Sequence, residues 1–225
     1  FITYSYAALE VLQKEKKNGV FTVLCQIDPG IVERKIVNSE YSKWPEFFKE
    51  KIKIHIEYEE RVKQEWEIAD LILVNSRWSK KALVSTGVAE SKIEILPLAY
   101  DPVPGSNDNV AVNKEHASLK ILWLGDVIPR KGIQYLLEAA KKLVNESVEF
   151  IIVGDIKIPA DIIKKSSQNI TWIGGVPRSK AVEYYKQSDI FLLPTISDGF
   201  AITQIEAMNY GLPVIATTSC GDVVE

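Results

Sequence analysis

The chain has 225 residues, with 27 Lys and Arg against 30 Asp and Glu, and its formal net charge is −3. This length suggests two domains or one large one, and a composition of 46% hydrophobic and 25% charged residues excludes a disordered chain. A charge this close to neutral argues against a protein that envelops nucleic acid, because phosphate binding on that scale needs a basic surface. Cys25 and Cys220 are too few for a disulfide framework, and no apolar run reaches the about 20 residues that span a bilayer.

The first part of the chain alternates between short apolar runs and helical patterns. Apolar runs predict strands at residues 21–25, 71–74 and 92–96. Helical spacing begins at Tyr58, and a second helix is expected over residues 78–83, capped by Ser76 and ended by Gly87. Between the first strand and the first helix, Asp28-Pro29-Gly30 is a typical turn sequence.

Residues 101–118 are rich in Pro, Gly, Asn and Asp, and we interpret them as a linker between domains at 1–100 and 119–225. Beyond the linker, strands are predicted at residues 119–124, 150–153, 170–173, 190–193 and 213–216. Helices are expected over 133–144 and 181–187, with a third that ends at Gly211. Continuously apolar strands that alternate with helices indicate an α/β protein with doubly wound parallel sheets, covered on both faces.

Ligands of doubly wound folds bind beyond the carboxyl ends of the strands, so the loops after the strands are the candidate sites. In the loop 125–132, Gly125 permits close approach of a ligand to the backbone, and Arg130 and Lys131 place two cations beside a helix N-terminus. A diphosphate suits this arrangement; the alternative is a solvated basic turn. The loop contains neither the Gly-x-Gly-x-x-Gly fingerprint of dinucleotide-binding proteins nor a Walker sequence.

The loop after the strand 190–193 leads through Asp198 and Gly199 directly into a helix that carries Glu206. Gly199, at the expected helix start, allows backbone N–H groups to face an anion. Glu206 lies about 9–12 Å further along the helix axis than Asp198, at roughly 1.5 Å per residue. Carboxylates that far apart are suited to hydroxyls at two ends of an extended ligand. The alternative is an Asp that stabilises the helix dipole, together with an ordinary surface Glu.

Residues 198–216 read D-G-F-A-I-T-Q-I-E-A-M-N-Y-G-L-P-V-I-A. This segment resembles the E-x7-E motif of retaining glycosyltransferases with the GT-B fold, the family 4 or "group 1" class, which reads roughly E-G-F-G-L-x-x-x-E-A-M-A-x-G-x-P-V-I-A. Residues 121–132 and 153–155 are similar to the strand–G-R-L-x-x-x-K-G segment and the following turn of that family, and 69–76 resemble the end of its amino-terminal domain. The resemblance covers nearly the whole chain and implies two Rossmann-like domains that face a cleft, the first on the acceptor side and the second binding the donor.

The resemblance also implies roles for individual residues. Glu206 would hold the ribose hydroxyls of a nucleotide, and Asp198 would contact hydroxyls of the transferred sugar. Lys131, helped by Arg130, would neutralise the diphosphate leaving group. The remaining donor-binding residues expected from it are Gly125 and the backbone amides of Gly199, Phe200, Ala201 and Ile202. No metal ligands are expected, because no D-x-D metal motif lies in a suitable loop. No cofactor is expected, because the nucleotide-diphosphate sugar is itself the substrate.

Two positions depart from the family pattern. Asp198 stands in place of the usual Glu and is one methylene shorter, and Asp126 stands where many members carry the Arg of G-R-L. We expect Arg130 to supply the cation that Asp126 removes. In the first domain, Asp28 follows a strand whose end faces the cleft in the resembling enzymes, so it is a candidate for orienting acceptor or donor. Asx-Pro turn chemistry explains Asp28 almost equally well.

The resemblance therefore predicts a metal-independent hexosyltransferase that retains the configuration at the anomeric carbon. Its partners would be a nucleotide-sugar donor and a saccharide, lipid or small-molecule acceptor, without nucleic acid. We expect a cytoplasmic location, with peripheral membrane contact if the acceptor is a lipid. A nucleotide-sugar 2-epimerase of the same fold and a non-catalytic nucleotide-sugar-binding subunit are the alternatives. Compared with the family, the chain is expected to be truncated at both ends.

Overall fold

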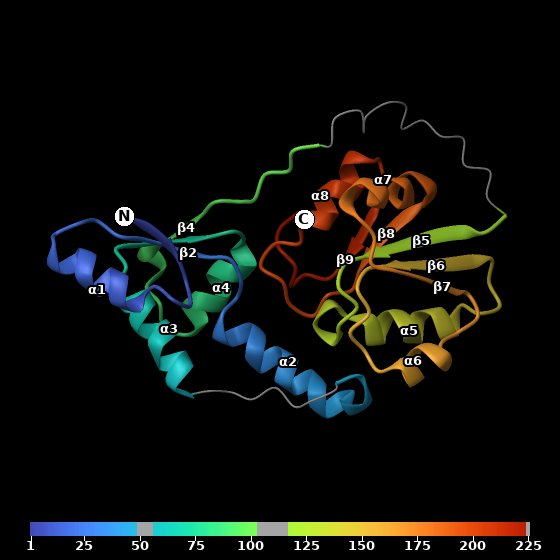
Figure 1. The fold of residues 1–225 in the computed structure, drawn as a ribbon, viewed down its shortest axis with the longest axis horizontal. Coiled ribbons are helices and arrows are strands. Elements are labelled where there is room, and N and C mark those ends of the chain that lie inside the picture. The colour runs from blue at the N-terminus through green and yellow to red at the C-terminus, as the bar shows by residue number, and fades with distance from the viewer. Residues whose placement is uncertain (49–55, 103–116, 224–225) are drawn as a thin grey trace.

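A computed structural model describes residues 1–48, 56–102 and 117–223, which form two parallel sheets (Figure 1). The first sheet has the order β1-β2-β3-β4, and every neighbouring pair is parallel. Its strands are β1 (Ile2–Tyr4), β2 (Val23–Gln26), β3 (Leu71–Val74) and β4 (Ile93–Ile95). The second sheet, also parallel, has the order β7-β6-β5-β8-β9. Its strands are β5 (Leu119–Leu124), β6 (Val148–Val153), β7 (Ile170–Gly174), β8 (Ile190–Leu193) and β9 (Val214–Ala216).

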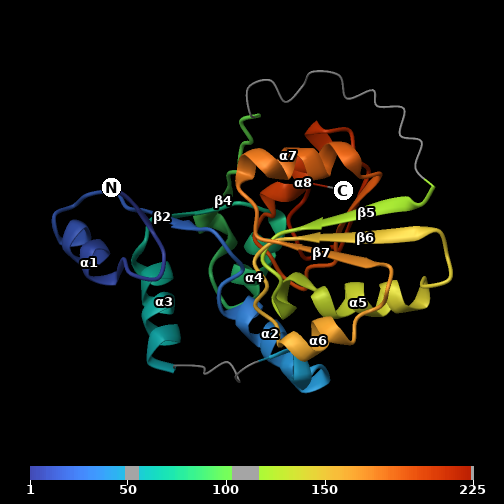
Figure 2. The same cartoon turned by 45° about the vertical axis from the view of Figure 1, so that its right-hand side comes forward.

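Helices cover both faces of the second sheet, as Figure 2 shows: α5 and α6 lie on one face, and α7 and α8 lie on the other. These helices are α5 (Ile133–Lys142), α6 (Ala160–Lys164), α7 (Arg178–Gln187) and α8 (Ile202–Asn209). Two hydrophobic clusters, one on each face, bury alternate residues of β5, with Leu122 in one and Trp123 in the other. The parallel α/β fold predicted from the continuously apolar strands is confirmed.

Around the first sheet, α1 (Leu9–Lys17), α3 (Ile56–Ile68) and α4 (Arg77–Ser85) contribute to a third cluster, which contains Leu12, Trp66 and Leu83. Ser76 caps α4 as predicted, since its hydroxyl accepts a hydrogen bond from the Ser79 N–H at 3.1 Å. The short 3₁₀ helices are η1 (Pro45–Phe47), η2 (Glu90–Lys92) and η3 (Pro129–Lys131).

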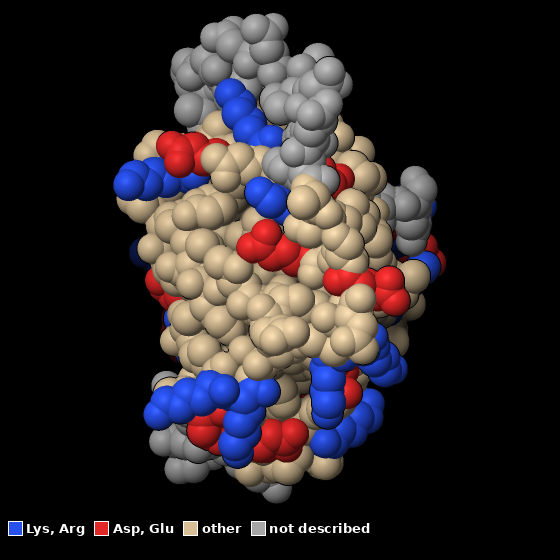
Figure 3. All heavy atoms as spheres, turned by 90° about the vertical axis from the view of Figure 1, so that its right-hand side faces the viewer, with Lys and Arg blue, Asp and Glu red and all other residues tan. Residues whose placement is uncertain are grey.

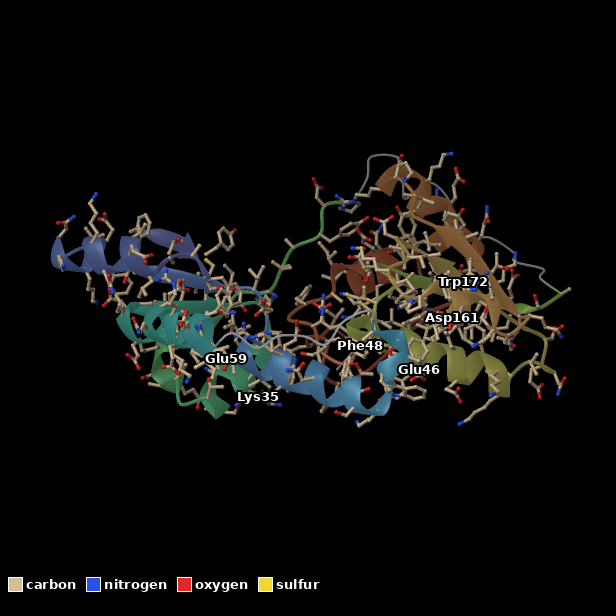
Figure 4. The ribbon with its side chains drawn as sticks, turned by 60° about the horizontal axis from the view of Figure 1, so that its bottom comes forward. Lys35, Glu46, Phe48, Glu59, Asp161 and Trp172 are labelled. Carbon is tan, nitrogen blue, oxygen red and sulfur yellow. The ribbon has the colours of Figure 1, made fainter. Side chains whose placement is uncertain are left out.

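Helix α2 (Ile31–Lys43) begins at the first sheet and ends against the helices of the second. Near its end, Glu40 is 3% exposed and accepts a hydrogen bond from the Tyr135 hydroxyl of α5 at 2.6 Å. In η1, Phe47 is buried in a cluster of the second sheet, and Phe48 packs beside it. Trp172 of β7 packs against the same cluster, and both Phe48 and Trp172 are labelled in Figure 4. A segment from the first part of the chain therefore belongs to the hydrophobic core of the second.

The predicted domain bounds stay a prediction, because most of the expected linker, residues 103–116, lies outside the described residues. On the face seen in Figure 3, Lys and Arg are interspersed with Asp and Glu around a broad band of uncharged residues. Within the described ranges, no helix combines the length and the apolar content needed to cross a bilayer.

Candidate functional site

The strand order of the second sheet reverses between β5 and β8. Chain connections leave these two neighbouring strands in opposite directions, so the loops after them separate at the carboxyl edge of the sheet. Gly125, Arg130 and Lys131 follow β5, and Asp198 and Gly199 follow β8. The residues that the sequence singled out in these two loops therefore flank the point at which this fold class binds ligands.

Two cations and one carboxylate from the two loops form an ion cluster. The Lys131 ammonium is hydrogen-bonded to Asp198 Oδ2, and the Arg130 guanidinium lies 3.4 Å from the same oxygen. Arg130 Nη1 also donates to the Ser197 carbonyl at 3.0 Å. The side chains of Lys131, Arg130 and Asp198 are 19%, 30% and 15% exposed to solvent. A ligand can therefore reach the cluster from solvent.

Backbone contacts fix the two loops against one another. The Arg130 carbonyl accepts hydrogen bonds from the Ile196 N–H at 3.0 Å and from the Thr195 hydroxyl at 3.1 Å. Gly132, in the left-handed region at φ 81°, lies so close to the other loop that a Cβ there would be 1.8 Å from the Pro194 carbonyl oxygen. The position of Arg130 and Lys131 beside Asp198 is thus set by the backbone.

Helix α8 begins later than the sequence suggested. Its first residue is Ile202, with Ala201 as N-cap, whereas we expected the helix to start at Gly199. The Asp198 N–H is bonded to the Ser219 carbonyl at 2.9 Å, which keeps this segment in the loop. Gly199 and Phe200 therefore precede the helix, and Ala201 and Ile202 form its N-terminal end.

Residues of the first sheet lie directly against this loop. A Cβ on Gly199 would be 2.2 Å from the Ile27 carbonyl oxygen, which follows β2, and 2.9 Å from the Asn75 side chain, which follows β3. Trp78 Nε1 of α4 donates to the Ser197 hydroxyl at 3.3 Å. The carboxyl edges of the two sheets thus meet at the Asp198–Gly199 loop, and this close approach requires a glycine.

A cavity of about 530 Å³ lies at the carboxyl ends of β5, β6 and β7. Gly125, Gly154 and Gly175 contribute backbone to its wall, and Glu206 closes one side. Glu206 is 9% exposed, so it is not the surface residue of the alternative interpretation. Its Oε2 accepts a hydrogen bond from the Tyr185 hydroxyl at 2.8 Å, and its Oε1 is 3.4 Å from Arg178. The volume is within the range of small-molecule pockets.

Tyr185 is a residue of the candidate site that sequence reasoning missed. Its burial, together with the neighbouring Glu206 carboxylate, raises the pKa of the Tyr185 phenol well above its usual range. The phenol therefore stays protonated and donates to Glu206, which leaves Oε1 directed toward Arg178 and the cavity. In the sequence Tyr185 is simply an apolar position of a helix.

Asp28 is held in a network of its own. Its Oδ1 accepts hydrogen bonds from the Tyr6 hydroxyl, from Gln26 Nε2 at 2.8 Å and from the Gly30 N–H at 2.8 Å. The bond from Gly30, two residues on, is the Asx turn that the sequence offered as the alternative. Among the described residues, Asp28 forms no ion pair or hydrogen bond with Lys131 or Asp198. A contact between Asp28 and substrate stays a prediction.

Glu33, in the first turn of α2, is the second residue of the candidate site that sequence reasoning missed. Its Oε1 lies 3.7 Å from Arg130 Nε, and its side chain is 16% exposed. Burial, only partly offset by the Arg130 charge, raises the pKa of Glu33 to about 7. A Glu in a first helical turn ordinarily favours the helix dipole, so its place in the sequence gave no sign of this environment.

This raised pKa makes the stability of the protein depend on pH. The folded pKa of about 7 lies above the ordinary value of 4.5, so the contribution of Glu33 to stability is complete below about pH 4.5 and is lost as the pH rises to about 7. We expect the free energy of unfolding of Glu33→Gln to exceed that of wild type by about 2 kcal/mol at pH 8 and to equal it at pH 4. Urea unfolding at both pH values measures the difference; an equal difference at both would contradict the prediction.

Residues 118–225 match the family described as "Glycosyl transferases group 1". An uncharacterized 41.2 kDa protein in the cps region of Klebsiella pneumoniae is 28% identical over 225 residues, covering 96% of this chain and 56% of that protein. The amylovoran biosynthesis glycosyltransferase AmsK of Erwinia amylovora is 25% identical over 166 residues, 68% of this chain and 40% of that protein. The chain thus spans about half the length of these relatives.

Among solved structures, Anabaena Alr3699/HepE in complex with UDP and glucose superposes with a TM-score of 0.64 at 18% identity. The superposition covers 98% of this chain and 60% of that one. This similarity shows that the chain shares the α/β fold of that structure. The family match covers the second sheet with its ion cluster and cavity. Residues 118–225 of this chain are thus similar to the Glycosyl transferases group 1 family.

Proposed function

We propose that this chain is part of a GT-B glycosyltransferase of family 4 that transfers a hexose from a nucleotide-diphosphate sugar to an acceptor hydroxyl. The observation that carries the proposal is the Lys131–Arg130–Asp198 cluster at the strand-order reversal, with the Glu206 cavity at the same carboxyl edge of the sheet, after β5, β6 and β7. The cavity would take the nucleoside, and the two cations would take the diphosphate. The two sheets would then be the two domains that face a cleft, with their carboxyl edges meeting at Gly199.

In this proposal each group acts on a different part of the donor. Glu206, oriented by Tyr185, accepts hydrogen bonds from the ribose hydroxyls. Lys131 and Arg130 neutralise the charge that develops on the departing diphosphate, which is the largest contribution a fixed site can make to such a reaction. Asp198 exchanges its bond with Lys131 for hydroxyls of the transferred sugar.

The proposal includes retention at the anomeric carbon and catalysis without a metal. The leaving phosphate would take the proton of the acceptor hydroxyl, so that no side-chain base is required. If EDTA abolished transfer by the full-length enzyme and Mn²⁺ restored it, the metal-independent part of the proposal would be wrong. The anomeric configuration of the product, read by NMR, tests retention.

The donor site is tested by thermal stabilisation of the 225-residue chain with UDP, GDP, ADP and their sugar derivatives. A ligand at 100 times its Kd adds about 2.7 kcal/mol, a shift of several degrees for a chain of this size. We expect one nucleotide to stabilise wild type and the Glu183→Ala control, which removes an exposed carboxylate from the neighbouring helix α7. Glu206→Ala should lose this stabilisation because the ribose hydroxyls lose their acceptor.

The outcomes separate the proposal from its alternatives. Stabilisation that is lost only in Glu206→Ala supports the donor site, whereas no stabilisation of wild type by any nucleotide contradicts it. Epimerised sugar released without an acceptor would identify a 2-epimerase. Nucleotide binding by the full-length protein without product from any saccharide, lipid or small-molecule acceptor would identify a non-catalytic subunit.

A further inference from the structure

Glu33 brings a carboxylate from the first part of the chain to the cation pair of the second. It stands in the first turn of α2, and its Oε1 is 3.7 Å from Arg130 Nε. Arg130 is thereby placed between two carboxylates, because its Nη1 is 3.4 Å from Asp198 Oδ2 on the other side. Any ligand that binds Arg130 changes the electrostatic environment of Glu33.

The charged groups around Glu33 do not balance its own charge. Arg130 of η3 is the cation that faces it, whereas Asp28 from the β2–α2 loop and Asp198 from the loop after β8 both disfavour the ionised form. The Ser197 hydroxyl lies close enough to favour that form. Glu33 Oε2 nevertheless is buried and has no partner with hydrogen-bond geometry. Among the described residues, Arg130 is therefore the cation that compensates an ionised Glu33, with a smaller contribution from the Ser197 hydroxyl.

A donor diphosphate competes for that arginine. This step rests on the proposed function, in which Arg130 and Lys131 hold the diphosphate. The diphosphate adds negative charge next to Glu33 and takes over the guanidinium that compensated it. We propose that donor binding draws a proton onto Glu33, so that this carboxyl group is neutral in the complex.

In the free protein the pKa of Glu33 is raised to about 7, chiefly by burial, and the bound diphosphate raises it further because the ionised form now faces more negative charge. Below about pH 7 Glu33 is already protonated and binding needs no proton. Above about pH 7 each complex takes up a proton, so the Kd rises by up to about tenfold for each pH unit.

Calorimetric titration with UDP-glucose tests the inference, because its diphosphate diester keeps a constant charge near neutral pH. Titrations at about pH 6, 7 and 8, each in buffers with different heats of ionisation, give the number of protons taken up. We expect wild type to approach one proton at the highest pH. Glu33→Gln, which mimics the neutral carboxyl group, should take up none and bind about tenfold more tightly than wild type at that pH.

A matched control is available in the same part of the chain. Glu59 of α3, labelled in Figure 4, is also 16% exposed and also faces an arginine, with its Oε1 3.6 Å from Arg34 Nε. Glu59→Gln should keep the proton uptake and pH dependence of wild type. His55 and His116 lie outside the described residues, so the variant, and not the wild-type profile alone, assigns the proton to Glu33.

The outcomes distinguish the role of Glu33 from the donor site itself. Equal proton uptake by wild type and Glu33→Gln overturns the role of Glu33 and leaves the donor site intact. Glu33→Ala repeats the test without an amide in place of the carboxyl group and should also bind without uptake. If wild type bound neither UDP-glucose nor the GDP and ADP sugars, the proposed function would fail, and the role of Glu33 would fail with it.

Discussion

Gly132→Ala is expected to lower the free energy of unfolding by at least about 3 kcal/mol. The added Cβ would lie 1.8 Å from the Pro194 carbonyl oxygen, so the loops after β5 and β8 would have to separate. The left-handed φ of 81° adds strain of about 1 kcal/mol for any residue with a side chain. For a chain of this size, the midpoint of thermal unfolding should fall by about 6–12 °C.

Gly87→Ala is the matched control for this prediction. Gly87 has a comparable φ of 98°, but an added Cβ would meet nothing within 4 Å. Backbone strain alone should therefore lower the free energy of unfolding of the control, by about 1 kcal/mol, and its unfolding midpoint by about 2–4 °C. Equal losses in the two variants would show that the close approach of Gly132 to Pro194 does not hold these loops together.

The strands of the second sheet were predictable because they are apolar on both faces. β5 coincides with its predicted range, 119–124, and β8 with 190–193. β1 was missed because it is an edge strand of three residues, with Ile2 and Tyr4 more than two-thirds exposed. Such a short, exposed strand leaves little periodic signal in the sequence.

Helix α2 was missed for a different reason. Its start packs with the first sheet through Ile31, and its end contacts α5 through the buried Glu40. The helix therefore presents different sides to different neighbours, and no single apolar stripe runs along it. The same long-range packing hides Glu33, whose unusual environment comes from Arg130, far along the chain.

The candidate site was predictable in its residues but not in its contacts. The two loops were found because ligands of doubly wound folds bind after the strands, and the family motif drew attention to Asp198 and Glu206. Lys131 and Asp198 are 67 positions apart, and nothing local in either loop encodes their ion pair. It arises from the strand order, which makes β5 and β8 neighbours.

Arg130→Glu should reduce the affinity for the donor diphosphate by at least about 100-fold, equivalent to about 2.7 kcal/mol. In the proposed donor complex the substitution would remove a charge-assisted contact to phosphate, and it places a third carboxylate beside Glu33 and Asp198. Lys131 would then be the one cation of this cluster that faces the diphosphate. Titration calorimetry with the nucleotide that stabilises wild type measures the loss, and the neutral Arg130→Met should give a smaller one.

Arg61→Glu provides the same charge reversal at a remote ion pair. Arg61 of α3 is paired with Glu10 of α1 at 2.8 Å, both are exposed, and neither touches the second sheet through a described ion pair. Its effect on affinity should stay within about threefold, because exposed charges far from the ligand are screened by salt. If Arg130→Glu, folded by circular dichroism, bound the nucleotide as tightly as Arg61→Glu, Arg130 would not contact the diphosphate. The replacement for the cation lost at Asp126 would then have to come from another residue.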